Sequence, residues 1–313
     1  MSARPAGIVL PLLLFAALAL VPLLAKLGPE SFILAIMTRV AILALAAMSL
    51  DLLIGYGGLV SFGHAAYLGI GAYAVGILSS HGIEEAGLQL AVGLAVAATF
   101  ALATGAIALR TEGVYFIMIT LAFGQMLFFL ATSLAAYGGD DGMTLSGRSR
   151  VFGTAFLRTD LGLYVASFAA LVLAYLLCRR ITVSRFGRVV AGTRENRVRM
   201  EAIGFSPYRF QLVAYVIAGT IAGLAGFLAA NQTEFVSPAS MSWQRSGDLI
   251  FMVVLGGTGT LHGAIAGAAA FILIEEVLSH VTEHWRIVFG PLLILAVLFA
   301  RGGIAGLFRP RGA

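Results

Sequence analysis

The feature that most constrains this chain is a series of long apolar runs, each bounded by polar residues or by glycine and proline. We place about ten of them, at 7–25, 31–54, 58–80, 87–109, 113–136, 161–178, 210–231, 247–258, 262–280 and 287–300. A bilayer core about 30 Å thick is crossed by a helix of ~20 apolar residues. The eighth run is short enough for a half-helix. The chain is therefore predicted to be an all-α polytopic membrane protein with about ten transmembrane helices, residues 1–313 forming a single permease-like domain.

Composition supports a membrane protein and excludes a soluble one. Of the 313 residues, 60% are hydrophobic and 11% charged, whereas a soluble domain carries roughly 25% charged residues. The net charge of +5 lies in segments between apolar runs, which is typical of membrane orientation. It therefore predicts no nucleic-acid partner.

The distribution of arginine predicts which side of the membrane each segment faces. The segment 179–209 contains eight arginines and two glutamates, and three more arginines lie in the C-terminal tail. Because arginine-rich short loops stay on the cytoplasmic side, we expect 179–209 and both termini in the cytoplasm. The segment 137–160 is then periplasmic, and the protein lies in a bacterial inner (plasma) membrane.

Two glycine-rich interruptions resemble each other. One combines Gly57, Gly58, Ser61 and His64, and the other combines Gly256, Gly257, Thr258 and His262. Paired interruptions of this kind indicate a transport path, so we take Gly58, Ser61, His64, Gly256, Gly257, Thr258 and His262 as candidate path residues. The alternative is that small residues allow close helix packing, with each histidine satisfying freed backbone groups.

Ionisable side chains inside the apolar runs are further candidates, because they are costly in a bilayer. Arg39, Glu275 and Glu276 lie toward the outer half of their runs, where they can pair with each other or with a partner subunit. Asp51 lies near the predicted cytoplasmic end of its run, where interfacial water can explain it. We take Glu276 as the candidate that contacts solute.

The segment 184–207 has the pattern of a short amphipathic helix. About four turns after Gly187 would place Ala191, Val198, Ala202 and Ile203 on one side, with arginines elsewhere. Gly204 can end such a helix. Its apolar side must dock either on lipid or in a groove on a protein partner.

The same segment resembles the coupling loop of bacterial ATP-binding-cassette (ABC) importer permeases, and in particular the LivM branch of branched-chain amino-acid permeases. The resemblance extends to Leu59–Tyr73, to 113–124, to Val254–Gly257 and to 290–295, in the order found in that family. It implies an ATPase-coupling role for Gly187, Arg188, Arg194, Glu195, Glu201, Ala202 and Gly204. It also implies a LivH-like second permease subunit, two cytoplasmic ATPase subunits and a periplasmic solute-binding protein.

The chain lacks the means to hydrolyse ATP by a P-loop. That motif requires a lysine that reaches the phosphates, and Lys26 is the one lysine here. We therefore expect no enzyme activity and no cofactor on this chain, with ATP and Mg on the partner ATPase subunits. The lone Cys178 predicts neither an intrachain disulfide nor a metal cluster.

The prediction is a permease subunit of an ABC importer for leucine, isoleucine and valine. A permease for urea or short amides remains an alternative, since such permeases look similar. An ion-coupled secondary transporter or a passive urea channel also remains open, although neither explains the amphipathic segment.

Overall fold

The computed structural model describes residues 6–26, 28–281, 287, 289–291 and 302–307. Within these residues, six helices are long and apolar enough to cross a membrane, at Glu30–Tyr56, Ala86–Ala108, Val114–Ser133, Asp160–Val183, Pro207–Thr233 and Leu261–His280. Three other predicted runs are also helical, namely α1 (Ala6–Ala25), α3 (His64–Ser80) and α10 (Trp243–Gly256). The protein is thus all-α and multi-pass. The run predicted at 287–300 lies largely outside the described residues.

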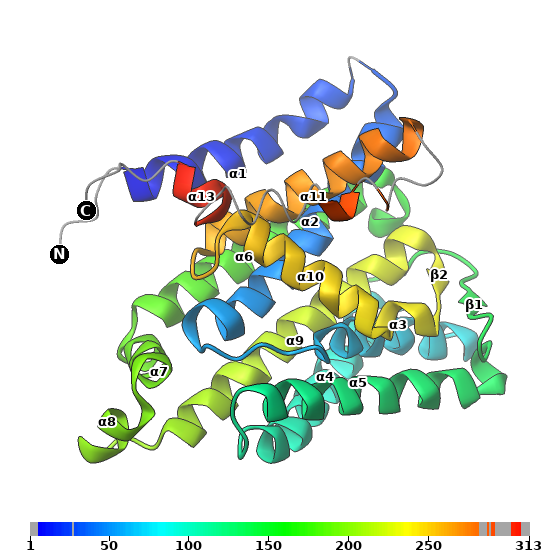
Figure 1. Ribbon diagram of the computed structural model, residues 1–313. Coiled ribbons are helices and arrows are strands. Elements are labelled where there is room, and N and C mark those ends of the chain that lie inside the picture. The colour runs from blue at the N-terminus through cyan, green and yellow to red at the C-terminus, as the bar shows by residue number, and fades with distance from the viewer. Residues whose placement is uncertain (1–5, 27, 282–286, 288, 292–301, 308–313) are drawn as a thin grey trace.

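The spanning helices run side by side between two distinct ends of the molecule (Figure 1). They are α2 (Glu30–Asp51), α4 (Ala86–Ala108), α5 (Val114–Ser133), α6 (Asp160–Val183), α9 (Pro207–Thr233) and α11 (Leu261–Val281). One end, which we call the arginine-rich end, carries α7 (Arg185–Glu195) and α8 (Arg197–Ala202). The short α13 (Gly303–Leu307) lies against α10 and α11.

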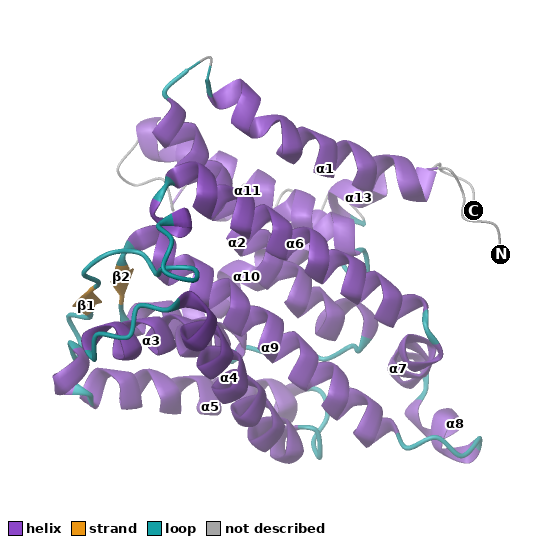
Figure 2. Cartoon of the chain, turned by 180° about the vertical axis from the view of Figure 1, so that it is seen from behind, coloured by secondary structure: helices purple, strands orange, loops and turns teal. Residues whose placement is uncertain are grey.

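The opposite end, which we call the loop end, is built from the segment predicted as a periplasmic loop. It contains the short helices η2 (Ala135–Tyr137) and η3 (Phe156–Arg158) and the strand β1 (Met143–Thr144). This strand pairs antiparallel with β2 (Phe235–Val236), which follows α9 (Figure 2). Ser149 ties the loop to the bundle: its amide donates to Asn231 Oδ1 at 2.7 Å, and its hydroxyl donates to Gln89 Oε1 at 2.5 Å.

The run predicted as a helical span at 58–80 is helical only in its second part. The end of α2 widens into a π-helical turn, η1 (Leu52–Tyr56), and residues 57–63 then extend from the arginine-rich end toward the start of α3 (Figure 1). Gly58 turns the chain there with φ +68°, a conformation that glycine adopts at little cost. The amide of Phe62 donates to Thr120 Oγ1 of α5 at 3.3 Å. Because residues 57–63 are not helical, a neighbouring helix supplies the hydrogen bond that this amide would otherwise make within its own helix.

A second element is also incomplete. The helix α10 has 14 residues, about 21 Å at 1.5 Å per residue, so it is too short to cross a bilayer core alone. It is preceded at the loop end by β2 and by the 3₁₀ turn η4 (Pro238–Met241). The half-helix expected from the short run 247–258 is thus present and begins four residues earlier.

Small residues hold the centre of the bundle together. A Cβ on Gly71 of α3 would overlap the carbonyl of Gly223 of α9, and a Cβ on Gly226 would overlap the carbonyl of Leu68. Such contact between backbones is a common basis of helix association in membranes, where the surrounding lipid is as apolar as the side chains. The buried Tyr67 hydroxyl adds a hydrogen bond to Thr104 Oγ1 of α4, at 3.0 Å.

The amphipathic segment forms two helices rather than the continuous helix that we predicted. Asn196 separates α7 from α8 with φ −159° and ψ 101°, and its Oδ1 accepts a hydrogen bond from the Arg199 amide at 2.8 Å. Asparagine favours this capping position because its side chain replaces the amide's helical partner. Four residues of α7 are buried, namely Gly187, Val189, Val190 and Thr193, whereas Met200 is the one buried residue of α8.

Candidate translocation site

The two glycine-rich interruptions meet at one point, which we call the glycine junction: Asp51, Gly55, Gly58, Arg194 and Gly259. A Cβ on Gly55, in the π-helical turn, would overlap the backbone of Gly259, which lies between α10 and α11. Because only hydrogen occupies that side of Gly55, the two interruptions are in direct backbone contact. The fold thereby joins segments about 200 residues apart, as the difference between 259 and 55 shows.

Asp51 holds the junction from α2. It is fully buried, and its Oδ1 accepts a hydrogen bond from the Gly259 amide at 2.8 Å. Its Oδ2 has no hydrogen-bond partner among the described residues. A buried carboxylate is costly unless its surroundings compensate for its charge, and within a membrane segment such a group is a functional candidate.

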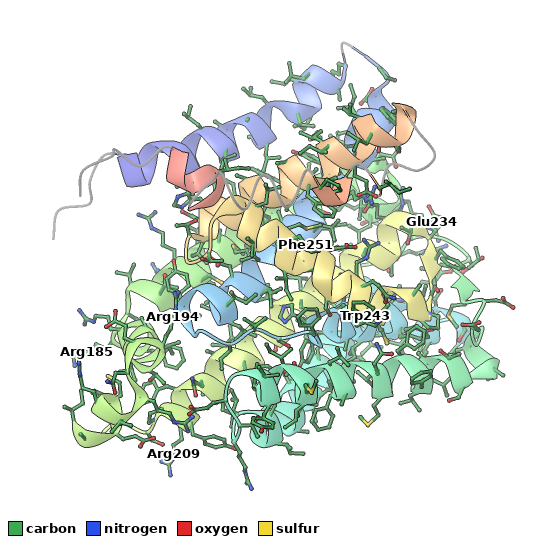
Figure 3. All side chains as sticks on the ribbon, in the orientation of Figure 1. Arg185, Arg194, Arg209, Glu234, Trp243 and Phe251 are labelled. Atoms are coloured by element: carbon green, nitrogen blue, oxygen red, sulfur yellow. The ribbon has the colours of Figure 1, made fainter. Side chains whose placement is uncertain are left out.

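Arg194 reaches the junction from α7. Its Nη1 donates to the carbonyl of Gly55, and its aliphatic stem lies against Gly58, where a Cβ would approach Arg194 Cγ to 2.8 Å. The resemblance to importer permeases implied an ATPase-coupling role for this arginine. In the structure it connects the arginine-rich end to an interrupted span of its own chain (Figure 3).

The first group of predicted path residues divides between the surface and the core. Gly58 is exposed at the junction, whereas Ser61 and His64 are fully buried. His64 Nε2 is hydrogen bonded to Ser49 Oγ at 2.8 Å, and neither His64 Nδ1 nor Ser61 Oγ has a partner among the described residues. In this conformation, therefore, Gly58 alone of the three can contact a solute.

The second group surrounds the turn between α10 and α11. Gly256 is buried against the carbonyl of Gly263, and Gly257 takes φ +108°. Thr258 is exposed and His262 half-buried. Glu276 lies farther along α11, half-buried, with His280 Nε2 3.2 Å from its Oε1. The structure thus brings the two glycine groups together and leaves Glu276 apart from them.

A different acidic residue of α11 makes the pair that the sequence suggested. Nη2 of Arg39 donates to both carboxylate oxygens of Glu275 at 2.9 Å. Of the two partners that the sequence left open for Arg39, an acidic residue on this chain is the one observed. The pair joins α2 to α11 in the half of the bundle nearer the loop end.

The exposed side of α10 differs chemically from the exposed sides of other helices. The outer side of α6 exposes leucine and valine along its apolar length, as expected for contact with lipid: Leu161, Val165, Leu173, Leu176 and Leu177. In contrast, α10 exposes Trp243, Gln244 and Phe251, with Arg245 and Asp248 half-buried beside them. Figure 3 shows Trp243 and Phe251 on one side of the molecule. Because polar groups at membrane depth face protein or water, this side of α10 is the best candidate to line a path.

The other predicted coupling residues lie at the arginine-rich end. Gly187 is buried where α6 turns into α7, and a Cβ there would overlap the carbonyls of Ile181 and Thr182. The remaining ones are exposed: Arg188, Glu195, Glu201, Ala202 and Gly204. Gly204 follows α8 with φ +90°, and Arg197 secures α8 through ion pairs with Glu112 and Glu201.

Interrupted spans that meet inside an all-α bundle, beside a half-helix with an exposed polar side, define a membrane transport protein. Residues 32–297 match the family described as branched-chain amino acid transport system / permease component. The chain belongs to this family.

The individual proteins that this chain resembles are also permease proteins of transport or import systems. The high-affinity branched-chain amino acid transport system permease protein LivM of Escherichia coli (strain K12) is 27% identical over 303 residues, 88% of this chain and 70% of that protein. LivH of the same strain is 25% identical, covering 84% of this chain and 91% of LivH. The autoinducer 2 import system permease protein LsrC of Enterobacter sp. (strain 638) is 28% identical, covering 75% and 68%. No solved structure matches the chain significantly.

Proposed function

We propose that this chain is a permease subunit of an ATP-driven importer that carries leucine, isoleucine and valine. A LivH-like permease would complete the membrane part, two ATPase subunits would bind ATP and Mg, and a periplasmic binding protein would deliver the amino acid. The family and the LivM and LivH relatives support the substrate class. The abundance of arginine in α7 and α8 supports a cytoplasmic position for that end, which would place the loop end in the periplasm and both termini in the cytoplasm of an inner-membrane protein.

The observation that supports this proposal most directly is the difference in burial between α7 and α8. The inner side of α7 is buried in its own chain through Val189, Val190 and Thr193. In contrast, Val198 of α8 is 74% exposed and Ile203, directly after α8, is 61% exposed at the arginine-rich end. An apolar surface surrounded by arginines outside the spans suits a groove on a protein partner, and the partner ATPase is the one we propose.

Uptake by the complete complex tests this function. The chain would be reconstituted with a LivH-type permease, the ATPases and the binding protein of the same organism, and labelled leucine, urea and autoinducer 2 would be offered with and without ATP. We expect ATP-dependent accumulation of leucine. Accumulation of urea or autoinducer 2 instead would overturn the substrate class, and entry of leucine without ATP would overturn the ATP-driven mechanism.

Replacing Val198 by aspartate should detach the ATPases. Burying a valine contributes about 1.5–3 kcal/mol, so placing a charge in that contact should weaken ATPase binding roughly tenfold or more. We expect the ATPase chains to be lost during purification of the Val198→Asp complex, and leucine uptake to fall with them. The change in ATPase binding is measured by titrating the detergent-solubilised permease with the ATPase chains and recording how much ATPase co-purifies.

Two comparisons make this result specific. Val198→Ala removes only part of the apolar contact, so ATPase binding should fall to a level between those of the native complex and of Val198→Asp. The Val198→Asp permease should remain monodisperse, because its side chain is 74% exposed and supports little of the fold. Full retention of the ATPases by Val198→Asp would show that α8 does not dock there.

A further inference from the structure

A cavity of about 380 Å³ lies in the half of the bundle nearer the loop end. It is lined by residues of α2, α3, α9, β2, η4 and the first turn of α10. We call it the outer cavity. Its volume falls within the range of about 300–1,000 Å³ in which small-molecule sites occur.

Two arginines line the outer cavity, one from a spanning helix and one from the first turn of α10. Arg39 enters from α2 and Arg245 from α10, with side chains 34% and 37% exposed. A guanidinium in a membrane segment is costly and is usually retained for function. Arg39 is held by Glu275 through Nη2, and a guanidinium has five N–H donors, so it can bind a further acceptor while this ion pair persists.

A carboxylate lies beside each arginine. Neither Glu275 nor Asp248 lines the outer cavity itself, so the lining carries two positive charges that these neighbours offset. Arg39 pairs with Glu275 at 2.9 Å, and Arg245 Nη1 lies 3.4 Å from Asp248 Oδ2. Two guanidiniums whose charge is offset from outside the lining favour a ligand that has a carboxylate but no full net charge. An α-amino acid, which combines one carboxylate with one ammonium, has this character.

The rest of the lining divides into an apolar and a polar side. Ile42, Leu43 and Leu68 form apolar wall on α2 and α3, while Ser237 and Ser240 line the cavity from the β2–η4 segment. Ser237 Oγ accepts a hydrogen bond from the Ala239 amide at 3.2 Å, and a hydroxyl oxygen has a second lone pair that can accept from a ligand. An aliphatic side chain suits the first side and an ammonium group the second.

We infer that the outer cavity is a binding site for a branched aliphatic α-amino acid on its way through the permease, with Arg245 and Arg39 binding the carboxylate. This inference rests on the proposed function and adds a site to it. Neither urea nor a simple amide needs two guanidiniums. The site is lined by Leu68 and Ala72 of α3, which follows the first glycine-rich interruption, and by Arg245 of the half-helix α10.

Protection of an introduced cysteine tests the site independently of transport. Ser240→Cys would place a thiol in the outer cavity, and the native Cys178 is fully buried. The assembled complex would be treated with a small methanethiosulfonate reagent, and labelling of this chain would be followed by mass spectrometry. At leucine concentrations nine times its dissociation constant, labelling should slow about tenfold, because only the unoccupied fraction reacts.

Matched controls assign the protection to this cavity and to the carboxylate. Ser80→Cys, exposed at the end of α3 outside the cavity, should label at the same rate with and without leucine. Isopentylamine, which is leucine without its carboxylate, should not protect Ser240→Cys. Combining Ser240→Cys with Arg245→Gln should raise the leucine concentration required for protection at least several-fold. Equal protection by the amine, or no effect of Arg245→Gln, would overturn the assignment to the carboxylate.

The result also separates this inference from the proposed function. If the complex accumulates leucine but leucine never protects Ser240→Cys at concentrations that saturate uptake, the outer cavity is not the site and the importer function stands. If leucine is neither accumulated nor protective, both fail.

Discussion

Replacing Gly226 by valine should largely abolish the folded protein in the membrane. The Cβ would overlap the carbonyl of Leu68, and a backbone carbonyl inside a packed helix cannot move aside as a flexible side chain can. Overpacking destabilises a fold by about 1–3 kcal/mol where the neighbours can relax. We expect a destabilisation at the upper end of this range or beyond it for Gly226→Val, because α3 and α9 must separate. The yield of monodisperse, detergent-extracted protein measures the effect.

Gly87→Val is the matched control. Gly87 also lies in a helix, α4, but is exposed, and its Cβ would meet nothing closer than Glu85 Oε1 at 4.0 Å. Both variants change helix propensity by the same small amount, so a difference between them reports the packing of α3 on α9. Similar yields for the two variants would show that this backbone contact does not hold the bundle together.

The positions of the spanning helices could be read from the sequence because length and apolarity determine them. The predicted runs 87–109 and 262–280 correspond to Ala86–Ala108 and Leu261–Val281. In a bilayer every backbone amide needs an internal partner, so a long apolar run has few alternatives to helix. The turn at Gly204 was likewise predictable from glycine, and φ +90° is observed there.

The failures occur where backbone geometry, rather than hydrophobicity, decides the structure. Residues 57–63 include Leu59, Val60 and Phe62, so the segment appears as apolar as a helix, yet it is extended and bonded to Thr120. The amphipathic segment was predicted as one helix because its apolar spacing continues past Asn196, whose capping side chain breaks it.

The contacts that form the glycine junction could not be predicted from the sequence. We attributed Asp51 to interfacial water because it lies near the end of its run, but the turn between α10 and α11 covers it. Nothing in the local pattern shows that Gly259, more than 200 residues away, donates to its carboxylate. A charged residue inside an apolar run is the one signal of this contact that the sequence contains.

Replacing Arg194 by alanine should uncouple transport from ATP hydrolysis. The carbonyl of Gly55 would lose its charged donor, an interaction that contributes about 1.5–3 kcal/mol, and α7 would lose its side-chain link to the first interrupted span. If ATPase movement reaches the path through this link, leucine uptake should fall roughly tenfold or more, while ATP hydrolysis by the complex continues. Uptake and phosphate release, measured on the same proteoliposomes, give the ratio of solute moved to ATP consumed.

Arg185→Ala provides the comparison, because Arg185 begins the same helix, is exposed, and lies at the outer edge of the arginine-rich end (Figure 3). It loses the same charge without touching the glycine junction, so its ratio of uptake to hydrolysis should match that of the native complex. The Arg194→Ala complex should also keep its ATPases, unlike Val198→Asp, since α8 is unchanged. Equal ratios for Arg194→Ala and Arg185→Ala would mean that α7 acts through another contact. A low ratio confined to Arg194→Ala would make the Gly55 carbonyl the point where cytoplasmic movement enters the spans.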